Sequence, residues 1–263
     1  PDGTTENNIV LRGEGKVART RYVVLNPDTT DRARRYLALY IDNVPGLTEF
    51  AASSPDGIHW KTEKKIGDLR HVRGGKVTKN PPFFLIEQQW ANDPNDGHRY
   101  RSIWRTESQD LLNWTGGKIV VDRLVDDDPD LEFYHAASHF MGSQSYHGVH
   151  FGYLYLFHTD TSRKVRGDGV RLAGTVETSL MFSRDTIAWT RADRKRRFLP
   201  LGPEGSWDGK MNYLMPEVSI GDSLYFYYCG FEKDHAFTKN KASIGLATLP
   251  RDRFISLAAA DGP

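Results

Sequence analysis

Three acidic side chains occupy matching places in the sequence and could take part in acid–base chemistry. Asp68, Glu132 and Asp208 each lie near the start of the strand that is predicted to open one of three successive repeats. In the first repeat the corresponding strand is expected to begin within residues 6–10. Carboxylates that converge on one side of a fold repel one another, so one of them can hold a proton at neutral pH.

A protonated carboxyl group beside an ionised one suits the hydrolysis of a glycosidic bond. The protonated group donates to the leaving oxygen, and the ionised group acts as a nucleophile or as the base that activates water. A third carboxylate can hold the substrate and tune the acid. Alternatively, each of these residues caps the start of a strand or joins a surface ion pair, and their positions alone leave both interpretations open.

A turn that recurs four times marks the repeats whose strands position these residues. Its pattern is a serine, an aspartate two residues later, and a tryptophan four residues after the aspartate; the fourth copy is degraded and ends in Phe254. A recurring unit of this kind is typical of a repeat architecture. We expect the aspartate to accept backbone N–H groups within the turn. The aspartates, separated by 54, 75 and 67 residues, are Asp56, Asp110, Asp185 and Asp252.

Each turn is preceded by a run of aromatic and branched residues that favours a strand. A second, alternating stretch lies between this run and the turn, as in residues 178–183. No stretch of about twelve residues or more has a helical periodicity. Each repeat therefore holds about four strands, the outermost beginning at the tryptophan, as in a blade of a β-propeller. The aromatic runs are residues 35–41, 83–86, 151–157 and 224–228.

These patterns predict an all-β fold, with a single β-propeller domain over residues 1–263. The alternative is a β-sandwich with regular hairpins. The propeller is favoured because the turn recurs with the same polarity and the same aromatic residue after it. A protein-interaction propeller of the WD type fits less well, because its shorter blades carry a Gly-His and Trp-Asp signature that this chain lacks.

Composition narrows the classes of partner. The net charge is +1 and the pI is about 8.3, which predicts neither a nucleic-acid nor an anionic-membrane partner. No apolar run approaches the roughly 20 residues of a membrane span. The single cysteine, Cys229, is expected in the core and cannot form an intrachain disulfide. The chain begins Pro1-Asp2-Gly3 without a methionine, which looks like an internal start, so localisation is not predicted. Oligomeric state is not predicted either.

The sequence predicts no cofactor and no metal site. It has neither a phosphate-binding glycine loop nor a nucleophile elbow, and its nine histidines show no metal-ligand spacing. Residues 126–130 are rich in aspartate but lack the spacing and the glycine of an EF-hand, so we expect a solvated acidic loop. The basic run at residues 191–197 is expected to be a solvated outer strand.

Several segments, taken in order, carry a family resemblance that covers nearly the whole chain. They are residues 7–10, 35–36, 54–60, 128–134, 198–202, 205–208, 227–230, His235, 244–247 and 253–257. In this order they resemble the five-bladed β-propeller glycoside hydrolase superfamily. The nearest resemblance is to bacterial proteins described as glycosyl hydrolase family 32 N-terminal-like. Four blades are visible in the sequence, and the fifth is absent or unrecognised.

The resemblance implies a role for each candidate residue. Glu132 would be the acid, and Asp208 and Asp68 would share the remaining roles, one as nucleophile or base and the other as the residue that orients and tunes. Trp207 would be a stacking platform for a sugar ring. The weaker substrate contacts would be His135, Glu217 and His235.

The implied activity is hydrolysis of a terminal glycosidic bond in a poly- or oligosaccharide, so a carbohydrate is the expected partner. An exported or periplasmic location is compatible with the family. The alternative is a non-catalytic carbohydrate-binding or scaffold propeller. Carboxyl groups about 5–5.5 Å apart would suit a retaining enzyme and about 6.5–9.5 Å an inverting one, whereas carboxylates in separate ion pairs would favour binding alone. An arc of four blades would also leave strand edges exposed.

Overall fold

The structure is a computed structural model that describes residues 9–13, 18–43, 47–67, 82–92, 97, 99–138, 147–166, 170–237 and 239–254. Its regular structure is β-strand apart from one 3-10 turn at Arg32–Arg34, which confirms the all-β prediction for these residues. None of the helical structure described has the length and apolar character of a membrane span. The chain divides into two compact units, which are Pro1–Trp90, Trp104–Ile119 and Met141–Ser143, and Ala91–Ile103, Val120–Phe140 and Gln144–Pro263.

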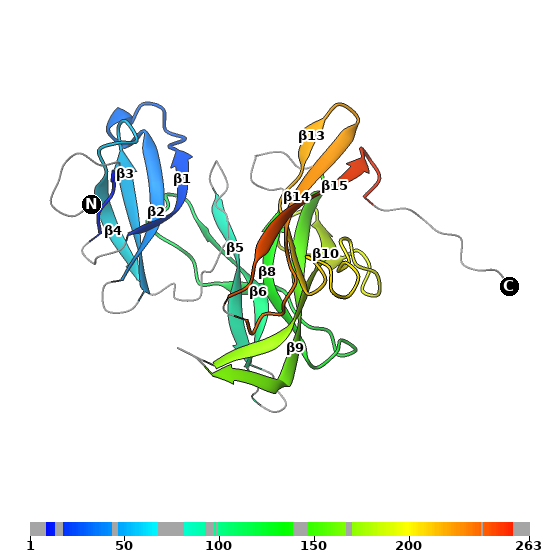
Figure 1. The fold of residues 1–263 in the computed structure, drawn as a ribbon. Coiled ribbons are helices and arrows are strands. Elements are labelled where there is room, and N and C mark those ends of the chain that lie inside the picture. Colours follow the sequence, from blue (N-terminus) through cyan, green and yellow to red (C-terminus); the bar gives the residue numbers. More distant parts are fainter. Residues whose placement is uncertain are drawn as a thin grey trace. The chain divides into compact units, whose positions relative to one another are not determined.

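The first unit contains a four-stranded antiparallel sheet in the order β1-β2-β3-β4 (Figure 1). Successive residues of a strand face opposite sides of its sheet, so β2 can bury both faces. Leu37 and Leu39 pack on one face in a cluster that includes Phe83. Ala38 and Tyr40 pack on the other face. The strands are β1 (Arg19–Leu25), β2 (Tyr36–Asn43), β3 (Leu47–Ser54) and β4 (Lys61–Gly67).

Three further strands form a sheet in the order β5-β6-β7, and their residues are divided between the two units. The aromatic start of β5 contributes Phe83 and Leu85 to the core of the first unit. The remaining residues of these strands include buried apolar side chains such as Ile86 and Ile103, and polar ones such as Arg101 of β6. The strands are β5 (Phe83–Asn92), β6 (Arg99–Ser108) and β7 (Lys118–Val121).

An eight-stranded sheet belongs to the second unit. In the third repeat, β9 and β10 form a long hairpin, with β8 paired to β9 and β11 paired to β10. In the fourth repeat, β14 pairs with β12 and β13 on one side and with β15 on the other. The strands are β8 (Leu131–Ser138), β9 (His150–Arg166), β10 (Val170–Ser183), β11 (Thr190–Arg191), β12 (Met211–Leu214), β13 (Val218–Ile220), β14 (Ser223–Phe231) and β15 (Ala242–Pro250).

The core of the second unit is a cluster of aromatic residues between two repeats. Tyr153 and Phe157 of β9 are fully buried, and they belong to one cluster with Leu224 and Phe226 of β14. The rings of Tyr153 and Phe226 meet edge to face, with centroids 5.7 Å apart. The aromatic runs therefore form strands, as predicted, because their side chains fill the space between one repeat and the next. Cys229 of β14 was expected in the core, but it is a free and only partly buried thiol.

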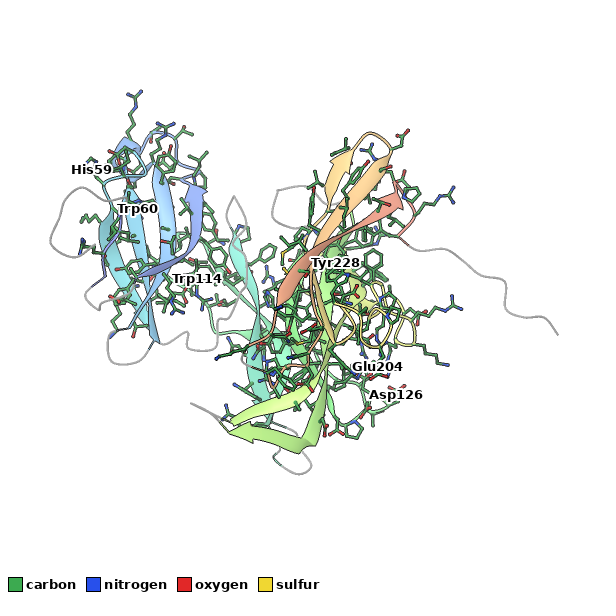
Figure 2. The ribbon with its side chains drawn as sticks, viewed as in Figure 1. His59, Trp60, Trp114, Asp126, Glu204 and Tyr228 are labelled. Carbon is green, nitrogen blue, oxygen red and sulfur yellow. The ribbon has the colours of Figure 1, made fainter. Side chains whose placement is uncertain are left out.

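The recurring turn has the same hydrogen bonds in its first three copies. In the third copy, Oδ1 of Asp185 accepts the backbone N–H groups of Ile187 and Ala188, each at 2.8 Å. The indole N–H of Trp189 donates to the carbonyl oxygen of Thr186 at 3.0 Å. This confirms the predicted role of the aspartate. The copies that end in Trp60 and Trp114 repeat these contacts (Figure 2).

The fourth turn departs from this pattern. Asp252 has a φ of 65°, the left-handed conformation that Gly57, Leu111 and Thr186 adopt one residue after the aspartate of their turns. Asp252 therefore occupies the place after the expected aspartate, and Arg251 stands where the aspartate would be. Assigning Asp252 to the aspartate position was wrong by one residue, because the degraded copy has no serine to define the register.

The predicted opening strands agree with the structure in two repeats. β8 begins at Leu131 and β12 at Met211, close to the expected starts. In the first repeat the strand begins at Arg19, so the expected start within residues 6–10 is wrong where it is described, at Ile9 and Val10. In the second repeat, residues 68–71 lie outside the described residues. The sheets described do not join into a closed ring, so five blades remain a prediction.

One buried carboxylate lies on β3 of the first unit. Glu49 is 2% exposed, and it forms an ion pair with Nε of Arg21 at 3.7 Å. Within the part of the chain that the structure describes, neither carboxylate oxygen of Glu49 has a hydrogen-bond donor. Burial raises the pKa of Glu49 to about 7, and the charge of Arg21 opposes this shift.

We expect the pH dependence of stability to reflect this shift. The folded state binds the proton of Glu49 more tightly than the unfolded state, whose pKa is near 4.5. The stabilising contribution is therefore complete below that value and is lost as the pH rises through 7. Glu49→Gln should be more stable than the wild type at pH 8 by up to about 3 kcal/mol, and close to it at pH 5.

Urea unfolding at pH 5 and pH 8 measures this difference. The matched control is Glu204→Gln, which changes a carboxylate whose side chain is 90% exposed. If the wild type and Glu49→Gln lost or gained stability in parallel between the two pH values, Glu49 would not be the titrating group.

Candidate functional site

Glu132 is held at the start of β8 by backbone contacts. The N–H and hydroxyl groups of Thr159 both donate to the carbonyl oxygen of Asp130, at 3.0 and 2.9 Å. These bonds fix the start of β8 beside β9. Glu132 is 4% exposed and lies directly across from Phe157. Its carboxylate is therefore on the same face as the aromatic residue of the neighbouring strand.

The carboxylate of Glu132 forms an ion pair with Arg101 of β6. The two side chains are 5% and 14% exposed, so the pair is largely shielded from water. The guanidinium group also lies over the rings of Tyr134 and Phe157, at 5.6 and 5.5 Å from their centroids. Such cation–π contacts hold an arginine in place as well as neutralise it.

Sequence reasoning missed Arg101. It lies 31 residues from its partner and is one of three arginines on β6, so nothing in the local pattern distinguishes it. The one available signal is the placement of an arginine on a strand that also carries apolar residues such as Tyr100 and Ile103, since such a charge requires a partner when the strand is buried.

His235 joins the surroundings of Glu132 from the loop between β14 and β15. Its backbone N–H donates to the carbonyl oxygen of Gly174 at 3.0 Å, which fixes the residue. Its Nε2 lies 3.1 Å from the hydroxyl of Tyr134, and its ring is 4.8 Å from that of Phe157. Two predicted site residues are therefore connected to the rings of Tyr134 and Phe157. His235 contacts these rings directly, and Glu132 is connected to them through Arg101.

His135 lies after a bulge in β8. The register with β9 shifts between Phe133 and His135, so Tyr134 is the extra residue. Such bulges redirect side chains, and they are frequent beside active sites. The ring of His135 packs edge to face on Tyr155, with centroids 5.7 Å apart. Its observed neighbour is therefore an aromatic residue of the core cluster.

Asp208 belongs to a second group of side chains, in the loop before β12. Its Oδ1 accepts a hydrogen bond from the hydroxyl of Ser206 at 2.8 Å, and its Oδ2 accepts one from Tyr228 at 2.9 Å. Burial and the hydrogen bond to Asp208 raise the pKa of Tyr228 to about 12. The phenol therefore keeps its proton at neutral pH and remains a donor to the carboxylate.

Trp207 stacks on Tyr228, with ring centroids 5.4 Å apart and an interplanar angle of 22° (Figure 2 labels Tyr228). Close approach of the indole requires glycine on the neighbouring strand, since a Cβ at Gly245 would lie 2.7 Å from Cη2 of Trp207. Trp207 is still 39% exposed. Part of the indole therefore remains available to a ligand, in keeping with the predicted stacking role.

Glu217 is buried among the aromatic residues of the core. It is 8% exposed, and its Oε2 accepts a hydrogen bond from the hydroxyl of Tyr153, a residue with no exposed surface. Burial and the neighbouring carboxylate raise the pKa of Tyr153 well above its usual value. Glu217 thus supports the packing of β9, and contact with a substrate stays a prediction.

The described residues place the candidates in two bonded groups. Glu132 is held by Arg101, and Asp208 is held by Ser206 and Tyr228. Within the described ranges, this ion pair and these hydrogen bonds of the two carboxylates involve no residue in common. Asp68 lies outside the described residues. A set of three converging carboxylates therefore remains a prediction.

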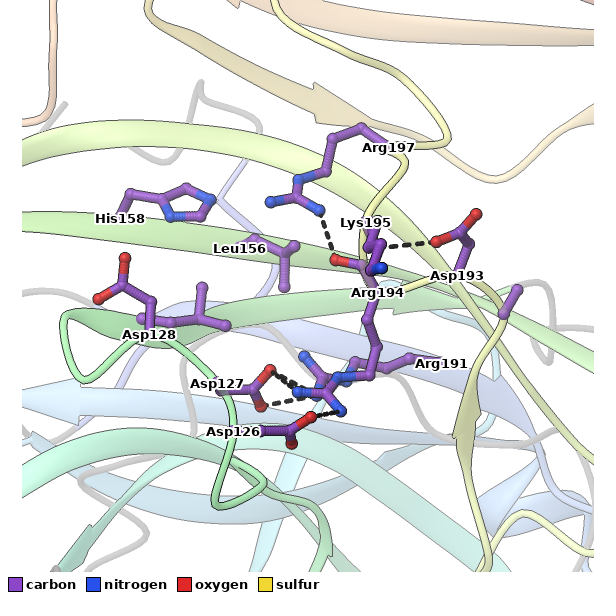
Figure 3. Close-up of a pocket in the computed structure, with 12 residues that line it drawn as sticks. Asp126, Asp127, Asp128, Leu156, His158, Arg191, Asp193, Arg194, Lys195 and Arg197 are labelled. Carbon is purple, nitrogen blue, oxygen red and sulfur yellow. Dashed lines mark hydrogen bonds and ion pairs between the residues drawn. The ribbon is translucent and has the colours of Figure 1, made fainter.

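A cavity of about 650 Å³ lies on the second unit, between the loop before β8 and the loop after β11 (Figure 3). Asp127 accepts from Nη2 of Arg191 at 2.6 and 2.8 Å and from Arg194 at 2.9 Å. Arg194 also donates to Asp126 at 2.7 Å. These four residues form what we call the Asp127–Arg191 cluster.

The Asp127–Arg191 cluster refines two predictions. Most of the acidic loop is solvated as expected, with Asp126, Asp128 and Asp130 exposed, but Asp127 pairs with the basic run. Only Arg191 of that run belongs to a strand, so the expected outer strand over residues 191–197 is wrong beyond this residue. The side chains of Asp127 and Arg191 are only 6% and 7% exposed. Among the described residues, no group of three or more His, Cys, Asp or Glu side chains could hold a metal ion. The cavity thus has balanced charge and no metal-ligand set in that part of the chain.

No protein-family model matches the sequence, and no curated protein matches it. Solved structures are similar in fold. A glycoside hydrolase has a TM-score of 0.53 and 14% identity, over 92% of this chain and 72% of its own. A Bombyx mori GH32 beta-fructofuranosidase has a TM-score of 0.51 and 14% identity, over 83% of this chain and 44% of its own.

A third similar structure comes from the GH130 family of mannoside phosphorylases, which contains glycoside hydrolases that target β-1,2-mannosidic linkages in Candida mannan. It has a TM-score of 0.50 and 14% identity, over 88% of this chain and 67% of its own. These matches confirm the resemblance to the glycoside hydrolase propeller superfamily at the level of the fold. At such identities, activity does not follow from fold.

Proposed function

We propose that this chain is a glycoside hydrolase that cleaves a terminal glycosidic bond of a poly- or oligosaccharide. The observation that carries the proposal is Glu132, a shielded carboxylate at the start of β8 that pairs with Arg101. The guanidinium group of Arg101 lies over the ring of Tyr134, and the hydroxyl of Tyr134 is bonded to His235. The fold of the similar structures supports the same class of activity. In this proposal Asp208 and Asp68 supply the other carboxylates.

The proposed acid role of Glu132 has a consequence for Arg101. A general acid must carry a proton when the substrate is bound. In the ion pair with Arg101 the carboxylate is charged. The contact with Arg101 must therefore loosen during turnover, so that the carboxyl group can donate to the leaving oxygen. Without such loosening, Glu132 would suit the role of nucleophile or base.

A non-catalytic carbohydrate-binding protein is the second candidate. One observation favours it: Glu132 and Asp208 have separate partners in the described structure, an arginine in one case and two hydroxyl groups in the other. Carboxylates held in this way can orient sugar hydroxyl groups without cleaving the glycosidic bond.

A screen for turnover and binding separates the two candidates. The protein is incubated with aryl glycosides and with plant, algal and microbial oligosaccharides, and the anomer of each product is read by NMR. Binding of the same oligosaccharides is measured by calorimetry. Turnover supports the hydrolase, and binding without turnover between pH 4 and pH 9 supports the second candidate. The absence of both turnover and binding would contradict both candidates.

Trp207→Ala should weaken carbohydrate binding by about 2- to 13-fold, since a stacked ring contributes about 0.5–1.5 kcal/mol. A binding titration measures the effect. Trp189→Phe is the control, because that indole belongs to the third turn and its N–H is bonded to Thr186. Equal affinities of the wild type and Trp207→Ala would exclude Trp207 as a stacking platform.

A further inference from the structure

The cavity of about 650 Å³ on the second unit is separate from the surroundings of Glu132 (Figure 3). All of its lining residues belong to the second unit, and they include Leu131 and His158. These two residues lie opposite each other on β8 and β9, whereas Glu132 lies opposite Phe157. Successive residues of a strand face opposite sides of the sheet, so the cavity and the carboxylate of Glu132 lie on different faces. We call it the His158 cavity.

The inner surface of the His158 cavity is apolar. Leu131 and Leu156 line it and are only 5% and 2% exposed. Figure 3 shows Leu156 among the polar side chains that surround it. The volume is within the range of about 300–1,000 Å³ that small-molecule sites occupy. The cavity can therefore accept the C–H groups of a small ligand as well as its polar groups.

Two polar side chains of the cavity are held in place by a carboxylate behind them. Oε1 of Glu177 lies 3.0 Å from Nε2 of His158 and accepts from Nε of Arg197 at 2.5 Å. Nη1 of Arg197 donates to the carbonyl oxygen of Arg194 at 2.9 Å. In the described part of the chain, Nδ1 of His158 and Nη2 of Arg197 have no hydrogen bond. Both groups are thus positioned in advance and remain available to a ligand.

A carboxylate oxygen and an ammonium group of the cavity are also available. Oδ1 of Asp128 accepts the backbone N–H of Asp130 at 2.9 Å, and Oδ2 makes no hydrogen bond to a described residue. Nζ of Lys195 likewise has no hydrogen bond or ion pair among the residues that the structure describes. The cavity therefore offers one strong acceptor together with several donors.

The charges of the lining residues indicate an uncharged ligand. An anion or a cation would meet as many like charges as opposite ones. A hydroxyl group both donates and accepts, so a ring that carries several hydroxyl groups can use the carboxylate and the cations together. A sugar ring combines such an edge with C–H faces. The charged residues that line the cavity are Asp126, Asp127, Asp128 and Asp193, and Arg191, Arg194, Lys195 and Arg197.

We propose that the His158 cavity binds an uncharged sugar unit. In this proposal Asp128 accepts a hydrogen bond from one hydroxyl group, and Arg197 and Lys195 donate to others. The C–H groups of the ring pack on Leu131 and Leu156. Binding at this place needs neither Glu132 nor cleavage of a glycosidic bond, so it goes beyond the proposed hydrolase activity.

A titration of the whole ¹⁵N-labelled chain by NMR tests the proposal. The probes are the methyl α- and β-glycosides of glucose, mannose, galactose, xylose and arabinose, up to about 50 mM. We expect at least one of them to shift the Nε–H resonance of Arg197 and the amide resonances of residues 126–128. The double variant Asp128→Asn, Lys195→Met should weaken this binding about tenfold or more, because hydrogen bonds to charged groups are lost.

Two controls accompany the double variant. Asp222→Asn, Lys239→Met makes the same changes at exposed positions of the second unit that do not line the cavity, and it should bind like the wild type. Glu132→Gln separates the two sites, since the shifts at the cavity should persist in it. Circular dichroism checks that each variant is folded.

Three results would overturn the proposal. The first is that none of the methyl glycosides shifts the cavity resonances. The second is that the folded double variant binds as tightly as the wild type. The third is that glucose 6-phosphate or glutamine shifts the same resonances at lower concentrations than every methyl glycoside, because the cavity would then select a charged group. A lack of turnover in the glycoside screen changes none of these results, so the two proposals can fail separately.

Discussion

Replacing Glu132 by glutamine is expected to lower kcat/KM by about 10²- to 10⁴-fold, the usual contribution of a positioned acid or base. The amide has nearly the same shape, so packing against Phe157 should persist. It can still accept a hydrogen bond from Arg101 through its oxygen. It can neither donate a carboxylic proton at neutral pH nor act as an anionic nucleophile. The measurement is kcat/KM on whichever glycoside responds in the screen.

The control for this variant is Glu107→Gln. Glu107 is a carboxylate on β6 whose partner is Arg105, at 2.6 Å, and its side chain is 38% exposed. We expect its activity to match that of the wild type. Wild-type activity in a folded Glu132→Gln protein would remove Glu132 from the mechanism, while activity lost together with the native circular dichroism spectrum would show that Glu132 is needed for folding.

Removing the carboxylate of Asp127 should destabilise the second unit by about 3–5 kcal/mol, the usual cost of breaking a buried ion pair from one side. Asp127→Ala leaves Arg191 without its partner, although the arginine side chain is only 7% exposed. It also removes the acceptor of the Leu124 backbone N–H at 2.8 Å. The free energy of unfolding in urea measures the effect.

The pH dependence of this contribution has a definite sign. Burial alone would raise the pKa of Asp127, but the hydrogen bonds from Arg191, Leu124 and Arg194 lower it overall. The stabilisation is therefore present above the unfolded pKa and is lost as the pH falls through the folded value. Acid should thus narrow the difference between the wild type and Asp127→Ala.

Two further variants distinguish a buried pair from a general loss of charge. Asp126→Ala removes a carboxylate from the same cluster, but its side chain is 66% exposed, so we expect a much smaller loss of stability than for Asp127→Ala. Replacing both Asp127 and Arg191 by leucine and methionine should restore much of the lost stability, because no charge then remains buried. Equal effects of Asp126→Ala and Asp127→Ala would contradict the assignment.

Local pattern predicted the elements of this fold well. The aromatic runs became β2, β5, β9 and β14, because such residues fill the space on both faces of a sheet. The three intact turns formed as expected, because their hydrogen bonds join residues within four positions of one another. The assignment of the aspartate in the degraded fourth turn was wrong, because the register of the turn depends on a serine that this copy lacks.

The candidate site was harder to predict because its contacts join distant parts of the chain. Glu132 was recognisable at the start of β8, but Arg101 can be identified as its partner only from the structure, in which the two side chains form an ion pair. Glu217 carries a carboxylate like the others, yet it is buried against Tyr153, a residue 64 positions away. A residue's type does not reveal which distant partner will meet it.

The sequence by itself determined the all-β class, the repeat and the positions where chemistry could occur, since these depend on side-chain periodicity and short-range hydrogen bonds. Only the tertiary structure decided which charges are paired, because ion pairs such as Asp127–Arg191 form between segments that are 64 residues apart. It alone also decided which core side chains meet. Tyr153 and Phe226 are in contact only because residues of β9 and β14 pack in one cluster.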